Sequence, residues 1–218
     1  MRRAAASLVL FAAVCSGCGA FKPWAAHATR AQKPASPLKA PADKAVLVVV
    51  VTNPQGSGNG SYSVLEGDGL VAQIPEDLAA WTAREMTPGE HQFYVRTWTS
   101  DFCVRRDAHF AAGKVYVLNL NPANTDRTGL VGSNGNIFPV GRFERPGSYD
   151  PAGSLAFLPY VAMDEAGAAK ELADRASQAA SCREHADAMA REMAQRDPAS
   201  TAAHDAGFEE IDFTVPAK

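Results

Sequence analysis

The sequence lacks an apolar stretch long enough to cross a bilayer, and it lacks a recognisable catalytic signature. Its longest apolar run, Ala4 to Val14, has about 11 residues, whereas a membrane-spanning helix needs about 20. It contains no G-x-S-x-G elbow, no glycine loop followed by Lys and Ser or Thr, and no second Cys or His pair at zinc spacing. We therefore expect no catalytic residues, no metal and no cofactor.

The sequence also lacks an excess of positive charge. The 218 residues include 21 Lys and Arg against 24 Asp and Glu, which gives a net charge of −3. Loss of residues 1–17, which contain Arg2 and Arg3 and no acidic residue, would leave 19 basic residues and a net charge of −5. Nucleic-acid faces and polybasic membrane patches both need an excess of Lys and Arg. The composition argues against a nucleic-acid partner, and the length suits one domain with appendages.

The N-terminus has the order of a secretory signal peptide. Basic residues at positions 2 and 3 precede the apolar run, and small residues follow it up to Ala20. Two of the four cysteines, Cys15 and Cys18, lie at the end of this segment. A thioredoxin-type C-x-x-C would instead open a helix inside a folded βαβ unit. We therefore expect residues 1–17 to be a removed signal.

The segment Cys15-Ser16-Gly17-Cys18 resembles the lipobox of bacterial lipoproteins, in which small residues precede an invariant cysteine. The resemblance implies that Cys18 is acylated and becomes the new N-terminus, although Cys15 stands where Leu is usual. Several acyl chains anchor stably because each buried CH₂ contributes about 0.8 kcal/mol. Gly19 in place of Asp favours the outer over the inner membrane, on the periplasmic side or at the cell surface. Cleavage by the ordinary signal peptidase, which would leave a soluble periplasmic protein, is the alternative.

Residues 18–43 are punctuated by four prolines and show no hydrophobic period. This composition predicts a disordered or polyproline-like tether of about 25 residues, which could lift a domain well above the membrane. Phe21 and Trp24 lie near the anchor. They either settle in the lipid interface, where aromatic rings are favoured, or are incidental to the tether.

Residues 44–162 show short strands with turn residues between them. Val46–Val51 is apolar at every position and predicts a central strand covered on both faces. Five further strands are expected from alternation and turn chemistry, at Tyr62–Leu65, Leu70–Ile74, His91–Thr99, Phe102–Phe110 and Val115–Leu120. Strands at roughly ten-residue spacing predict a mainly β fold, an antiparallel β-sandwich or a small open barrel.

Residues 44–121 contain three turn motifs, namely Gly67, Asp68 and Gly69; Pro88, Gly89, Glu90 and His91; and Ala112, Gly113, Lys114 and Tyr116. In these motifs the segment resembles the PEGA-like and related uncharacterised β-domains of bacterial lipoproteins. The resemblance implies a cell-envelope accessory module and provides no catalytic residues to carry over. His91 is interpreted as a structural residue at the start of a strand.

The C-terminal third differs from the preceding strands in composition and in hydrophobic period. Residues 122–154 are rich in Gly, Asn and Pro and predict a wandering hairpin or a binding loop, with a short strand at Ile137–Phe143. A strand is expected at Ser154–Met163. Residues 163–197 predict one amphipathic helix, capped by Asp164, that either packs on the domain or binds a partner. The tail, 198–218, alternates apolar residues and could add an edge strand.

Cys103 and Cys182 remain once the signal is lost. An even pair in an oxidising compartment predicts a disulfide, which would clamp the helix to the β-domain, and two buried free thiols are the alternative. Together these patterns predict a non-catalytic, lipid-anchored envelope protein with a protein or glycan partner. A periplasmic enzyme with a site in residues 122–154 is the second hypothesis.

Overall fold

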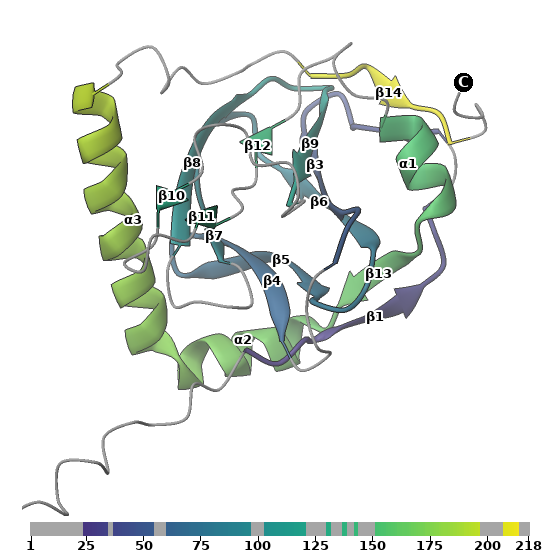
Figure 1. Cartoon of the computed structure of the whole chain (residues 1–218). Helices are drawn as coiled ribbons and strands as arrows, with labels where there is room; N and C mark the ends of the chain where they lie inside the picture. The colour runs from purple at the N-terminus through teal and green to yellow at the C-terminus, as the bar shows by residue number, and fades with distance from the viewer. Residues whose placement is uncertain are drawn as a thin grey trace, which may run out of the picture.

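The computed structural model describes residues 24–34, 37–54, 60–96, 103–120, 130–131, 137–138, 142–143, 151–196 and 207–213. The predicted signal segment and Cys18 lie outside these residues. A mainly β fold followed by a C-terminal helical region is confirmed (Figure 1). None of the helices described is long and apolar enough to span a membrane.

The elements follow in chain order. The strands are β1 Ala28–Ala31, β2 Leu38–Lys39, β3 Ala45–Val51, β4 Ser61–Glu66, β5 Gly69–Pro75, β6 Ala80–Met86, β7 Gly89–Arg96, β8 Cys103–Phe110, β9 Val115–Asn119, β10 Leu130–Val131, β11 Ile137–Phe138, β12 Arg142–Phe143, β13 Tyr160–Met163 and β14 Glu210–Ile211. The helices are α1 Pro151–Phe157, α2 Glu165–Asp174 and α3 Ala176–Arg196.

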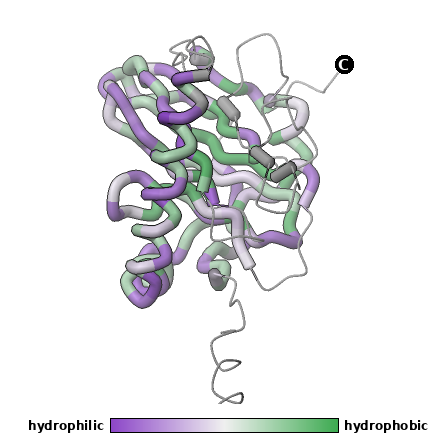
Figure 2. Tube along the Cα trace, turned by 60° about the vertical axis from the view of Figure 1, so that its left-hand side comes forward, coloured by the Kyte–Doolittle hydropathy of each residue, from purple (hydrophilic) through white to green (hydrophobic). Residues whose placement is uncertain are grey.

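Two sheets form the body of the protein. One has six strands in the order β1-β13-β6-β3-β9-β12, and the other has four in the order β5-β4-β7-β8. The main core lies between them, and it is built from Leu47, Val49 and Leu118 of the first sheet and from Val64, Ile74, Phe93 and Phe110 of the second. Figure 2 shows hydrophobic strands in the interior with more hydrophilic segments around them.

Strand β3 is buried at all seven positions, as its sequence predicts. Its odd-numbered residues face the sandwich core, while Val46, Val48 and Val50 face a second cluster on the outer side of the six-stranded sheet. Leu155 of α1 and Ile211 of β14 cover that side. A strand without polar alternation needs such cover on both faces.

The six-stranded sheet is mixed, whereas an antiparallel arrangement was expected. Strand β9 pairs with β3 in parallel, and β13 pairs with β6 in parallel. The reason is that the turns at Pro88-Gly89 and Ala112-Gly113 carry the chain from one sheet to the other and do not close hairpins. Turn chemistry fixes a local reversal, but it does not determine which strand becomes the neighbour.

The prediction of a disordered tether over residues 18–43 is wrong for the described part, 24–34 and 37–43. Strand β1 pairs with β13 and β2 pairs with β14, so this segment runs along the domain as a strap. Its core residues are Trp24, Ala28, Leu38 and Ala40. These four apolar residues are buried, but their irregular spacing gives no hydrophobic period in the sequence. The sequence therefore predicted a disordered tether.

The C-terminal elements also differ in detail. The strand expected at Ser154–Met163 is helix α1 followed by β13, and the single helix expected at 163–197 is divided into α2 and α3 at Arg175. Asp164 caps α2 as predicted and accepts from the backbone N–H groups of Ala166 and Gly167. Helix α3 packs on the outer face of the four-stranded sheet through Ala179, Cys182 and Ala186, and β14 is the expected tail strand.

Candidate functional site

The candidate site is the place where the chain enters the domain, directly after the predicted anchor. Trp24 is 1% exposed and lies in a third cluster between the four-stranded sheet and helices α2 and α3, with Leu65, Leu70 and Ala168. The guanidinium carbon of the buried Arg96 lies 4.7 Å from the centre of the indole ring. A cation over a desolvated indole face contributes a favourable electrostatic contact. Trp24 is therefore a packed anchor of the domain, and the proposal that it settles in the lipid interface is wrong.

Gln73 holds the backbone that follows Trp24. Its Oε1 accepts from the N–H of His27 at 2.6 Å, and its Nε2 donates to the carbonyl of Ala25 at 2.9 Å and to Oγ of Ser61 at 2.8 Å. Ser61 Oγ in turn lies 3.1 Å from Oγ of Ser63 and donates to the carbonyl of Trp24. A buried amide must be satisfied in this way because an unpaired one costs about 1–3 kcal/mol.

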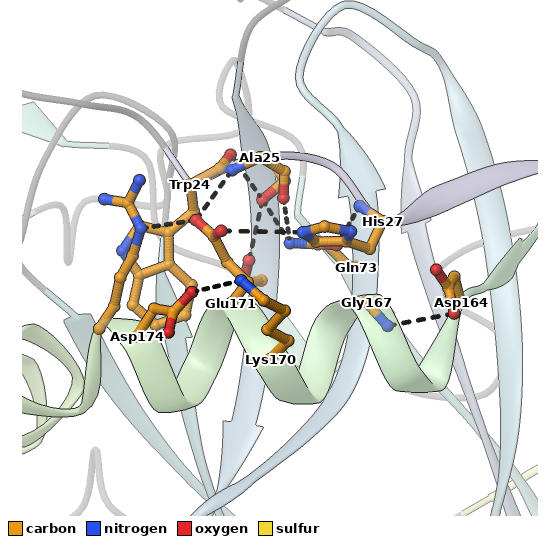
Figure 3. A network of polar contacts seen from close by, with 12 residues as sticks. Trp24, Ala25, His27, Gln73, Asp164, Gly167, Lys170, Glu171 and Asp174 are labelled. Carbon is orange, nitrogen blue, oxygen red and sulfur yellow. Dashed lines mark hydrogen bonds and ion pairs between the residues drawn. The ribbon is translucent and has the colours of Figure 1, made fainter.

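Glu171 of α2 binds the same segment from the other side (Figure 3). Its Oε1 accepts from the N–H of Ala25 at 3.3 Å and lies 2.5 Å from Nε of Arg175. Its Oε2 lies 3.8 Å from Nε2 of His27. The carboxylate therefore joins the N-terminal segment, helix α2 and the break before α3.

The start of α2 closes the site. The N–H of Asp164 donates to the carbonyl of His27 at 2.6 Å, and Gly167 lies directly below the His27 ring. Further along, Nζ of Lys33 donates to the carbonyls of Leu155 and Ala156 at the end of α1. Backbone and side-chain contacts thus follow the segment from Trp24 to Lys33. This arrangement fixes chain position, because Gln73 and Glu171 direct their polar atoms at the protein's own backbone.

Cys103 and Cys182 form the predicted disulfide between β8 and α3, with the Cα atoms 5.1 Å apart. Both residues are buried, so the alternative of two free thiols is not the arrangement seen. Five residues further along α3, Asp187 lies 3.1 Å from NH1 of Arg105 and accepts from the hydroxyl of Tyr94. Burial, and after it the hydrogen bond to Asp187, raise the pKa of Tyr94 above its usual value of 10. A second clamp on α3 comes from Arg183, which binds Asp68 and the carbonyl of Gly67 in the β4–β5 turn.

His91 and His109 each pair with a glutamate of a neighbouring strand. His91 is buried, with Nδ1 2.5 Å from Oε1 of Glu66 and Nε2 2.7 Å from the carbonyl of Thr87, which fits its interpretation as a structural residue. His109 pairs with Glu90 at the surface. On β8, burial lowers the pKa of Arg106 to about 10, so that its side chain is still charged at neutral pH.

The remaining sequence predictions fall largely outside the description. Of residues 122–154, only 130–131, 137–138, 142–143 and 151–154 are described, so the enzyme hypothesis for this loop stays a hypothesis. Within the described ranges no group of three or more His, Cys, Asp or Glu side chains could hold a metal ion. Sequence reasoning missed Gln73 and Glu171, although a lone Gln inside the apolar run Leu70–Ile74 was a usable signal.

No family model, no curated protein and no solved structure matches this chain.

Proposed function

We propose that this protein is an exported, non-catalytic lipoprotein of the bacterial cell envelope, acylated at Cys18. The observation that carries the proposal is the position of Cys15-Ser16-Gly17-Cys18 at the end of a basic, apolar and small-residue segment. The β-sandwich then serves as a binding or structural module for an envelope protein or a glycan. Gly19 after the modified cysteine favours the outer membrane.

One feature of the folded part supports export, and a second supports an accessory role in the envelope. A buried disulfide between Cys103 and Cys182 suits an oxidising compartment, since cytosolic thiols are kept reduced. The glycines with positive φ are Gly67, Gly89 and Gly113 among the described residues, and each lies in one of the three turn motifs by which the sequence resembles PEGA-like lipoprotein domains. That resemblance supports an accessory role in the envelope.

The test is intact mass spectrometry of the full chain expressed with its leader and extracted from membranes. We expect a protein that begins at Cys18 and carries diacylglycerol and acyl chains, with a Cys18→Ser variant that lacks both. Cys15→Ser is the matched control and should be processed and acylated normally, because Cys15 leaves with the signal. A wild-type chain that starts unmodified at another residue would contradict the proposal and favour a soluble periplasmic protein.

A further inference from the structure

The distance between Cys18 and Trp24 limits where the domain can lie. Six residue steps separate the two positions, and a fully extended chain spans at most about 3.6 Å per residue, or about 22 Å in total. This limit holds for any conformation of the intervening residues. A free tether over residues 18–43 would have reached about 80 Å at 3.1 Å per residue.

Trp24 fixes one end of this short link. Its side chain is enclosed by the domain beside Ala168 of α2, while the neighbouring Ala25 and Ala26 are exposed, so this end of the link lies close to the surface on the α2 side. The contacts of Gln73 and Glu171 hold the backbone of Ala25 and His27, which follow it. The other end is fixed if Cys18 is acylated, because the acyl chains keep that residue at the bilayer interface.

The link is shorter than the domain is wide. A compact domain of about 195 residues has a radius of gyration near 16 Å and a diameter of about 40 Å. With Trp24 held within about 22 Å of the interface, the domain cannot turn freely. Because this reach is close to the radius of the domain, Trp24 and the adjacent helix α2 must lie in the half of the domain nearer the lipid, and the opposite side cannot face it.

The chemistry of that side permits close approach to lipid headgroups. The outer surface of α2 exposes the small residues Ala166, Ala169 and Ala173. Lys170 pairs with Asp174 at 2.9 Å and Arg175 with Glu171 at 2.5 Å, while Glu165 at the start of the helix pairs with Arg84 of β6 at 3.1 Å. Paired charges reduce the repulsion that isolated carboxylates would meet at an anionic leaflet.

From this geometry we infer that the α2 face is the membrane-facing surface of the protein, with the domain held close to the bilayer. The β2–β14 side, which lies across the molecule from α2 in Figure 1, points away and is the surface that an envelope partner can reach. The inference rests on the proposed acylation of Cys18.

The experiment uses the full acylated chain in vesicles of phosphatidylethanolamine and phosphatidylglycerol that contain a headgroup-labelled quencher lipid. With Cys18 acylated and Cys103 bonded to Cys182, one added cysteine is the reactive thiol. A fluorophore is attached at Ala173→Cys on α2 or at Glu210→Cys on β14, both exposed positions. We expect several-fold stronger quenching at position 173 than at position 210.

A linker variant provides the control. Twenty Gly and Ser residues inserted between Lys22 and Pro23 add about 25 Å of root-mean-square reach. We expect this variant to float with the vesicles and to lose the difference between the two positions. Equal quenching at both positions in the native-length chain, or stronger quenching at 210, would overturn the orientation. Failure to float, with no acyl mass on Cys18, would instead overturn the proposed function and this inference with it.

Discussion

A Cβ atom added to Gly167 would lie 2.6 Å from Nδ1 of His27 and 2.5 Å from Oδ2 of Asp164. A side chain at position 167 would therefore force the His27 ring and the Asp164 carboxylate to move from their positions beside the first turn of α2. The hydrogen bond from Asp164 to the carbonyl of His27 depends on the same approach. Glycine is a poor helix former, and its presence at position 167 of α2 is explained by contact with a segment about 140 residues earlier in the chain.

The first prediction concerns Gly167→Ala. Helix propensity alone would make this change stabilising by about 1 kcal/mol. Because the new methyl group would displace His27, we expect a loss of about 1–3 kcal/mol in the free energy of unfolding. Urea denaturation gives the sign. The double variant with His27→Ala should recover part of the loss, whereas a stabilised single variant would show that the segment does not dock as described.

Trp24 should behave as a core residue. Replacing a buried Trp with Ala costs about 3–5 kcal/mol, so we expect Trp24→Ala to lower the free energy of unfolding by that amount. Phe157, which is 78% exposed, is the matched aromatic control, and Phe157→Ala should have little effect. Thermal and urea unfolding of both variants provide the measurement. Similar stability of the two would restore the idea of a free tether.

Reduction of the disulfide should weaken the whole domain. The bond joins residues 79 positions apart, and closing a loop of that length contributes about 4 kcal/mol in the chain-entropy model. We expect a reduced protein, or a Cys103→Ala and Cys182→Ala double variant, to unfold at much lower urea concentration. Thiol counting on the exported, unfolded chain is the check, and two reactive thiols there would refute the bond.

The raised pKa of Tyr94 predicts that the free energy of unfolding depends on pH in the alkaline range. The pKa is raised in the folded state, chiefly by burial and then by Asp187, so the folded protein holds the phenolic proton more tightly than the unfolded chain does. This stabilisation is complete below pH 10 and is lost as pH rises from 10 through the folded pKa. We expect the stability of the wild type to fall more steeply above about pH 10 than that of Tyr94→Phe. Parallel urea titrations of the two would argue against the shift, and Tyr160→Phe controls for loss of a hydroxyl.

The sequence alone determined the features that depend on neighbouring residues. The uninterrupted aliphatic run of β3 requires cover on both faces, and the turn at Gly67-Asp68 and the cap at Asp164 follow from local backbone chemistry. The pairing of Cys103 with Cys182 was also accessible, because two cysteines allow one bond.

The tertiary structure decided what depends on partners distant in the chain. Three features have no periodic pattern in the sequence that would predict them. They are the parallel pairing of β3 with β9, the division of the C-terminal helix at Arg175 and the docking of Trp24 beside Arg96. The residues that make the docking possible, Gln73, Gly167 and Glu171, come from separate elements. Their role exists only where folding brings them together, because a buried hydrogen bond or a close backbone approach is set by three-dimensional distance and not by spacing along the chain.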